Sequence, residues 1–363
     1  MKNKLLSTTA LMTAAVLSSV ATADVSITGM MEFTYESLDK GNQTTGASDD
    51  RFHTDQEINI MSSTKTDSGL EVGVVLTLQA AGQNASITGN SAVTSSGQIA
   101  GFGANTGLNA EETYMYIKGG FGTLQLGGND GAGDQLTRTA HDLIGPDALN
   151  DGGGSFHAMT GTSTGGRNLA DDNADLINDI DDENNITYIL PKMGGLTLGA
   201  SYKDAGDASA ENADETVVAA MYEFTSGDIK SSVHYGYNSI SGTVAGGGSL
   251  NSQTVGVDVS SGPIRAVFAQ AQSDVTTAIE TKVVDYGLQY TLGNGIVLSY
   301  VGTQVTENTG GESLDVTTIS AKYNIASGLD AYLTYHDYDY KIGTGDGTAD
   351  DGSSTHITIK TTF

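Results

Sequence analysis

The sequence predicts an all-β fold, a 16-stranded antiparallel transmembrane β-barrel. Three observations carry the prediction: segments that alternate apolar and polar residues, connections that alternate short and long, and a terminal strand that ends the chain. In that strand, residues 356–363, Ile357, Ile359 and the final Phe363 share one face, and Lys360 lies on the other. Alternation with a period of two gives a strand two different faces. A lysine among apolar neighbours fits a wall with lipid on one side and water on the other.

The amino terminus predicts export. Lys2 and Lys4 form a basic start, residues 5–20 are mostly apolar and uncharged, and Ala21 and Ala23 frame an A-x-A cleavage motif. This is the pattern of a secretory signal peptide. A membrane-spanning helix is a poorer fit, because the apolar run is short and rich in Ser and Thr. We therefore expect a signal peptide at residues 1–23 and a mature chain that begins at Asp24.

Composition narrows the class of the mature protein. Loss of two lysines with the signal leaves 14 basic against 44 acidic residues, a net charge of −30. This charge argues against nucleic acid as a partner, because phosphate binding needs a basic surface. The chain has no Cys, which excludes disulfides and thiol chemistry, and its 48 Gly against 3 Pro fit strands and turns. A mean hydropathy of −0.18 is too polar for a helical membrane protein and suits a barrel with one wet face.

The strands follow from alternation interrupted by Gly, Asn and Asp. Sixteen segments qualify, an even number, as closed single-chain bacterial barrels require. The predicted strands are 24–36, 52–62, 70–79, 113–118, 122–127, 185–190, 196–203, 216–224, 229–238, 253–260, 264–272, 282–291, 296–306, 315–325, 329–340 and 355–363.

The connections between these strands predict their orientation. Short turns such as 65–69, 225–228 and 326–328 alternate with long polar stretches such as 80–112 and 341–354. Short turns on one side and longer loops on the other are typical of outer-membrane barrels. We therefore expect one barrel domain, residues 24–363, in the outer membrane.

The alternation also assigns residues to the two faces of the wall. The basic residues fall on the inward, water-facing side of their strands. A Lys or Arg at mid-membrane costs about 2–4 kcal/mol, so the register is strongly specified. The predicted basic residues of the lumen are Arg51, His53, Lys203, Lys230, His234, Arg265, Lys322 and Lys360.

The longest connection is predicted to constrict the lumen. Residues 128–184 separate the fifth and sixth strands, and loops of that length are usually functional. If the loop folds inward, its carboxylates oppose the basic wall and create a transverse field. The candidate acidic residues are Asp130, Asp134, Asp142, Asp147 and Asp151. The alternative for the acidic run 171–183 is a solvated external loop.

The chain resembles the general porins of Gram-negative bacteria, and most closely those of the alphaproteobacterial, Rhodobacter-like type. The resemblance covers essentially the whole mature chain and rests on the order and spacing of several short motifs. The motifs are DVSITG at 24–29, TDSGL at 66–70, GGFGTLQLG at 119–127, YILP at 188–191, GLTLGASY at 195–202 and the terminal Phe363.

The resemblance implies a homotrimer whose long loop after Gly127 constricts each pore. It implies a diffusion channel for small hydrophilic solutes and ions, embedded among outer-membrane lipid and lipopolysaccharide. It also implies that Phe363 is a signal read by the barrel-assembly machinery. Members of the family often set several arginines opposite the loop acids. Here only Arg51 and Arg265 fall on the wall, and lysines fill in. From the charge of −30 we expect a weak preference for cations.

The resemblance also implies that calcium can bind to acidic loops, although no cofactor is required. Clusters of Asp offer the hard oxygen ligands that calcium prefers, but the spacing here is not that of an EF-hand. The candidate ligands are Asp171, Asp172, Asp175, Asp179, Asp181 and Asp182.

Other classes of function fit less well. The G-x-S-x-G match at 161–165 lies in a Gly/Ser/Thr-rich stretch without the strand-to-helix elbow that hydrolases need, so we expect no enzyme. A secreted calcium-binding β-roll would need tandem G-G-x-G-x-D repeats, which are absent. A substrate-specific channel on the same barrel remains the alternative to a general diffusion channel.

Overall fold

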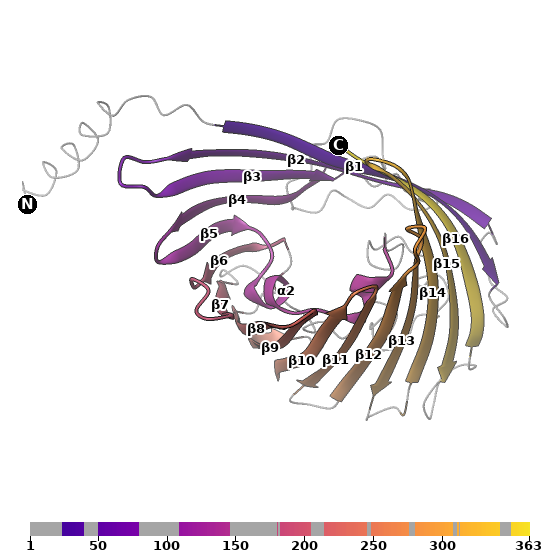
Figure 1. Cartoon of the computed structure of the whole chain (residues 1–363). Helices are drawn as coiled ribbons and strands as arrows, with labels where there is room; N and C mark the ends of the chain where they lie inside the picture. The colour runs from indigo at the N-terminus through magenta and orange to yellow at the C-terminus, as the bar shows by residue number, and fades with distance from the viewer. Residues whose placement is uncertain are drawn as a thin grey trace, which may run out of the picture.

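The computed structural model shows a closed barrel of strands around a lumen that holds two short helical segments (Figure 1). It describes residues 24–39, 50–79, 109–145, 180, 182–204, 214–244, 248–275, 280–307, 311, 313–341 and 350–363. Each strand pairs antiparallel with its neighbours in sequence, and β1 pairs with β16 to close the ring. The predicted 16-stranded antiparallel barrel is confirmed.

All sixteen predicted strands occur in the described residues, in the predicted order. They are β1 (Asp24–Asp39), β2 (Asp50–Lys65), β3 (Glu71–Gln79), β4 (Asn109–Gly119), β5 (Gly122–Gly128), β6 (Asn184–Ile189), β7 (Leu196–Lys203), β8 (Asp214–Ser226), β9 (Ile229–Val244), β10 (Gly248–Ser261), β11 (Ile264–Val275), β12 (Glu280–Thr291), β13 (Val297–Glu307), β14 (Ser313–Ala326), β15 (Leu329–Lys341) and β16 (Asp350–Thr362). Between β5 and β6 lie the helix α2 (Ala132–Leu136) and the 3-10 turn η1 (Ala140–Leu143), neither of which the sequence pattern predicted.

The ring closes at the last residue of the chain. The backbone N–H of Phe363 donates to the carbonyl of Gly29 at 3.0 Å, and the N–H of Gly29 donates back at the same distance. A Cβ on Gly29 would lie 2.8 Å from the Phe363 ring, so the glycine makes room for it. Backbone polar groups in lipid need partners, and closure gives the first and last strands theirs. Residues 1–23 lie outside the described part, and β1 begins at Asp24.

The two faces of the wall follow the predicted alternation. Large apolar side chains point outward and stay exposed, among them Leu288 at 52% and Ile319 at 54%. Inward positions on the same strands are polar and buried, as at Thr318 and Ser320. This arrangement is inside out relative to a soluble domain, because hydrocarbon is the solvent of the outer face.

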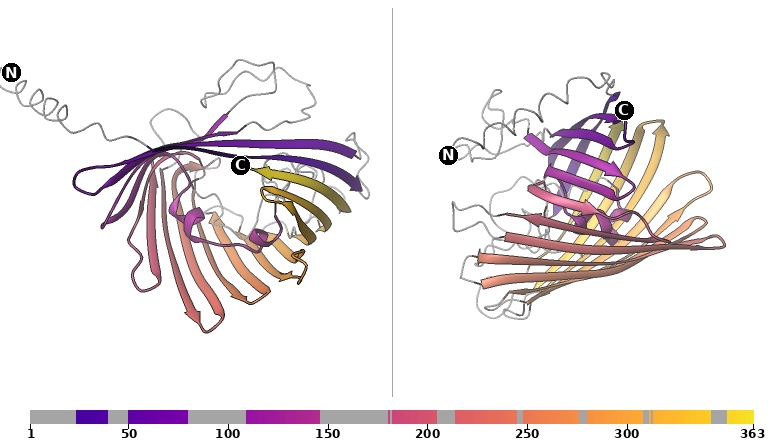
Figure 2. Two further views of the ribbon diagram at one scale, coloured as in Figure 1. Left: turned by 45° about the horizontal axis from the view of Figure 1, so that its top comes forward. Right: turned by 90° about the vertical axis from the view of Figure 1, so that its left-hand side faces the viewer.

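Strands at one end of the barrel are joined by tight turns, and four of these have two residues each. Gly227, Gly262 and Gly328 each adopt a positive φ of +55° to +73°, which a glycine tolerates without strain. The strands lean along the barrel and are of unequal length around it (Figure 2). No helix within the described ranges is long and apolar enough to span a membrane.

Deletion of Phe363 tests the closure. The variant loses two backbone hydrogen bonds in lipid, each worth about 0.5–1.5 kcal/mol, so we expect about 1–3 kcal/mol less unfolding free energy and a lower yield of folded barrel. Because Phe363 is 69% exposed on the lipid side, channels that do form should conduct like the wild type. Refolding yield, denaturant titration and single-channel recording measure these effects. A wild-type refolding yield would contradict the closure argument.

Candidate functional site

The chain after β5 turns into the barrel and rests on its inner wall. α2 contacts β6, β7, β8 and β9, and Figure 1 shows it inside the ring of strands. Ala132 and Leu136 on α2 are buried against Ala219 on β8. The backbone N–H of Ala132 donates to the Ser201 hydroxyl on β7 at 2.7 Å. The first described part of the predicted constriction loop, residues 129–145, therefore lies on the lumen side of the wall.

The η1 turn is held by polar side chains of a second stretch of wall. It contacts β11, β12 and β13. Gln289 on β12 and Ser299 on β13 both donate to the carbonyl of Leu143, the former at 2.9 Å. The His141 ring is 2.9 Å from the Thr303 hydroxyl. Wall side chains thus satisfy carbonyls that a short helical turn leaves without intrahelical partners.

An apolar patch on the inner wall surrounds these polar contacts. Ala140, Leu143 and Ile144 pack against inward-facing residues of β11 to β15, and all are at most 4% exposed. The wall residues of this patch are Val267, Ala269, Ala271, Val283, Val301, Val305, Leu314 and Tyr338. Full burial of a Leu or Ile stabilises by about 1.5–3 kcal/mol. The alternation of the strands assigned the inner face to water, so this apolar patch was not predicted.

Four of the predicted lumen bases pair with carboxylates on the inner side of the wall, namely Lys203, Arg265, Lys322 and Lys360. Lys360 lies 2.6 Å from Glu32, and Lys322 lies 2.9 Å from Asp330. Lys203 pairs with Glu215 at 3.3 Å and also with Glu183. These contacts join neighbouring strands, or a strand and the end of the loop, and they neutralise positive charge on the wall.

Arg265 joins the wall to the loop. Its guanidinium makes a two-pronged contact with Asp258 on β10, with N–O distances of 3.2 and 2.8 Å. The same group lies 3.7 Å from Asp142 on η1. The predicted opposition of a loop carboxylate and a wall base thus occurs at Asp142 and Arg265.

The remaining predicted bases are placed as follows. His234 faces inward, is 3% exposed and lies against Gly256 of β10. Lys230 is exposed at the start of β9, near the tight turn. Arg51 pairs in register with Glu36, and His53 with Thr34, but their side chains lie outside the described part.

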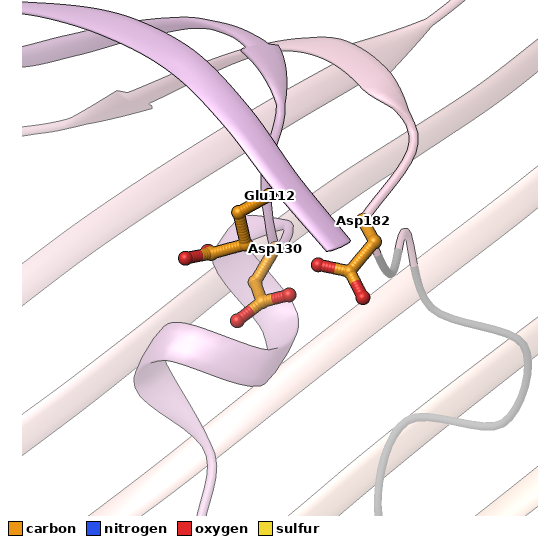
Figure 3. Close-up of side chains that lie close together, drawn as sticks. All are labelled: Glu112, Asp130 and Asp182. Atoms are coloured by element: carbon orange, nitrogen blue, oxygen red, sulfur yellow. The ribbon is translucent and has the colours of Figure 1, made fainter. Parts of the chain in front are cut away.

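Asp130 belongs to a group of three carboxylates near the two ends of the loop. Its carboxylate lies with those of Glu112 on β4 and Asp182 before β6, and one oxygen of each falls within 4.8 Å of the others (Figure 3). Asp134 is exposed on α2. Asp147 and Asp151 lie outside the described residues, as do Asp171, Asp172, Asp175, Asp179 and Asp181 and the 161–165 match. Three half-buried carboxylates in one place offer the oxygen ligands that hard cations prefer.

A buried group of imidazoles also escaped the sequence analysis. His336 on β15 and His356 on β16 are 2% and 3% exposed, with ring centroids 5.0 Å apart. The Thr318 hydroxyl is 2.8 Å from Nδ1 of His336, and Nε2 of His356 is 3.9 Å from Glu36. The alternation of the two strands puts both histidines on the inner face, and the register between β15 and β16 makes them diagonal neighbours.

Comparison with known proteins agrees with this geometry. The family model described as Gram-negative porin matches residues 7–343. No curated protein sequence matches this chain.

Solved porin structures share the fold. An anion-selective porin from Comamonas acidovorans is similar with a TM-score of 0.64 and 15% identity, covering 94% of this chain and 100% of that one. A mutant of the Rh. blastica porin gives 0.61 and 16%, with 94% and 100% covered. A loop-deletion mutant of OmpT, an outer membrane protein of Vibrio cholerae, gives 0.58 and 13%, with 94% and 99% covered.

Proposed function

Because this chain belongs to the Gram-negative porin family and is an outer-membrane channel protein, not an enzyme, we propose that it is a general diffusion channel with a weak cation preference. Small hydrophilic solutes and ions would cross the lumen passively, past the segment that carries α2 and η1. The observation that supports the proposal is this segment, whose α2 and η1 contact the inner side of a closed barrel.

The charges of the lumen support a preference for cations. The inward bases Lys203, Arg265, Lys322 and Lys360 are each in contact with a carboxylate. Further acidic residues occupy inward positions, among them Glu57, Asp285 and Glu307, and Glu112 accepts a hydrogen bond from the inward Thr77. Carboxylates in a narrow, low-dielectric passage attract cations and repel anions. The similar porin from Comamonas acidovorans is described as anion-selective, so the fold alone does not determine the ion preference. The charges that line the passage must determine it.

Reversing one loop charge tests the preference. We expect the wild type to give large, ohmic, non-saturating conductance steps in planar bilayers and a zero-current potential in a KCl gradient that favours potassium. Asp134→Lys, on the exposed side of α2, should shift that potential towards chloride. Asp67→Lys makes the same change of net charge on the exposed turn between β2 and β3, and should leave it near the wild-type value because salt screens charges beyond about 10 Å at 0.1 M.

The outcomes separate the alternatives. A wild-type potential that favours chloride would refute the cation preference. Conductance that saturates with one sugar or ion would favour a substrate-specific channel, and the absence of any channel would refute both readings.

Calcium binding is a further part of the proposal. The carboxylates of Glu112, Asp130 and Asp182 fit a hard cation because they supply oxygen ligands that lie within 4.8 Å of one another. Of the calcium ligands expected from the sequence, Asp182 belongs to this group. A bound ion would tie β4 to both ends of the loop.

Calcium should therefore stabilise the barrel. At a free concentration 100 times its dissociation constant, a ligand specific to the native state adds about 2.7 kcal/mol to the unfolding free energy. Denaturant titration with calcium and with a chelator measures the difference. Asp130→Asn should remove the response, whereas Asp67→Asn should keep it. An equal calcium response in the Asp130 variant would rule out this site.

We also propose a homotrimer, and the lengths of the strands indicate which side faces the neighbouring copies. A strand that crosses hydrocarbon needs about 9–11 residues. Three consecutive strands are shorter: β5 has 7 residues, β6 has 6 and β7 has 8. Their outward residues include Ile186 at 52% exposure. Strands too short to span the hydrocarbon would leave part of the wall without matching lipid. Further copies of the chain packed against this side would cover it.

Single tryptophans can locate that side, because the chain has none of its own. Ile186→Trp on β6 should be shielded from quenching by brominated lipids. Val255→Trp, on the lipid face of the 14-residue β10, should be quenched strongly. Strong quenching at both positions, or a monomeric mass in mild detergent, would contradict the proposed trimer side.

The lipid-side position of the chain end supports a role in assembly. Phe363 is 69% exposed, so the barrel-assembly machinery could read it while the barrel closes. The outward apolar belt would contact outer-membrane lipid and lipopolysaccharide. If recognition matters, deletion of Phe363 should lower barrel yield more in cells than in refolding without the machinery. Equal losses in both settings would leave closure alone as the role of this residue.

A further inference from the structure

Two inward-facing glycines lie directly beneath the helical segments of the loop. Gly199 on β7 lies under α2, and Gly287 on β12 lies under η1. We call these two residues the seat glycines. They stand five strands apart in the closed barrel, so they support the loop at two separate places on the wall.

At the first place, α2 occupies the space that a side chain on Gly199 would need. A Cβ on Gly199 would lie 2.9 Å from the Cβ of Ala132 and 3.0 Å from a methyl of Leu136. It would also lie 2.6 Å from a methyl of Ile189 on β6. The neighbouring inward residue on β8 is Ala219, which is also small. Distances near or below 3.0 Å mean that even an alanine at position 199 would displace atoms.

At the second place, η1 fills the gap in the same way. A Cβ on Gly287 would lie 2.7 Å from a methyl of Leu143 and 3.2 Å from the Cβ of Ala140. The third close atom, at 3.1 Å, belongs to Val301 on the neighbouring strand. Polar contacts complete this site, because Gln289, two residues further along β12, donates to the carbonyl of Leu143.

We propose that Gly199 and Gly287 are positioning residues that set how far the loop projects into the passage and thereby set the conductance of the channel. The inference rests on the proposed diffusion function. Glycine is required there by the packing of the loop on the wall and not by backbone conformation, because neither residue adopts a positive φ. Any side chain at these positions lifts α2 or η1 from the wall towards the passage.

Other glycines of the barrel provide a contrast. Gly302, on β13 next to Val301, points outward, and a Cβ there would meet only the Tyr286 ring, at 2.4 Å, among its nearest neighbours. It is as crowded as the seat glycines, but no loop residue is near it. Gly302→Val therefore makes the same substitution on the wall without touching the loop, which makes it the matched control.

The first experiment measures single-channel conductance of assembled barrels. Gly287→Val should lower it by pushing η1 into the passage, and adding Leu143→Ala should restore it towards the wild type by making room. Gly199→Val and Leu136→Ala should behave in the same way at α2. Gly302→Val should conduct like the wild type. Wild-type conductance in both seat variants, or losses that the second changes do not reverse, would overturn the proposal.

A second experiment holds even if the valine variants fail to assemble. The chain has no Cys, so Ala140→Cys combined with Gly287→Cys is the sole thiol pair. The pair is made with Leu143→Ala, which removes the methyl that a side chain at position 287 would meet at 2.7 Å and so keeps η1 on the wall. The two Cβ positions lie 3.2 Å apart, close to the roughly 3.5–4.5 Å of a disulfide. Oxidation of the assembled barrel should join them, whereas Ala140→Cys with Gly302→Cys should stay reduced. Failure of the first pair to join would overturn the placement of η1.

The two proposals fail in different ways. A wild type that forms no channel would refute the diffusion function, whether or not the two introduced cysteines form a disulfide. A conducting wild type whose seat variants conduct normally sinks only the role of the seat glycines.

Discussion

The structure depends on one constraint: hydrocarbon offers no partner for a backbone N–H or C=O group. A sheet in lipid must therefore close, and the paired backbone groups of Gly29 and Phe363 complete the ring. Closure divides every strand between two environments, because successive side chains point to opposite faces. Apolar residues then belong outside and polar residues inside, and a shift of one residue would carry Lys322, Lys360 and Arg265 into lipid.

This constraint explains what the sequence could predict. All sixteen strands were found because apolar and polar residues alternate along their membrane-spanning parts. The alternation follows from the two environments of the wall, lipid outside and the lumen inside. The ends of the strands were less predictable. β16 continues back to Asp350 through a stretch in which both faces are polar, and Gly352 still pairs with Tyr338. Beyond the hydrocarbon, the strands remain hydrogen-bonded although apolar and polar residues no longer alternate. A prediction based on alternation therefore makes the strand too short.

The interior was predicted only in part, and for a physical reason. α2 and η1 are one or two turns long, too short for helical periodicity, and they depend on tertiary packing. The wall on which they pack could have been recognised in the sequence. Apart from Arg265, residues 264–269 of β11 are apolar on both faces. In a membrane strand, one apolar face meets lipid. A second apolar face indicates that protein, and not water, covers the inner side.

The contacts of Arg265 link the position of the loop to the charge on the inner wall. The guanidinium is held rigidly by Asp258, a carboxylate of the wall, and reaches Asp142 on η1 at 3.7 Å. Retraction of η1 brings Asp142 nearer and cancels more positive charge, and projection of η1 exposes both groups to the passage. The packing of Leu143 over Gly287 sets that distance. If the seat glycines set the projection of η1 as proposed, this apolar contact also sets the exposure of Asp142 and Arg265. A change at the seat should then alter ion preference together with conductance.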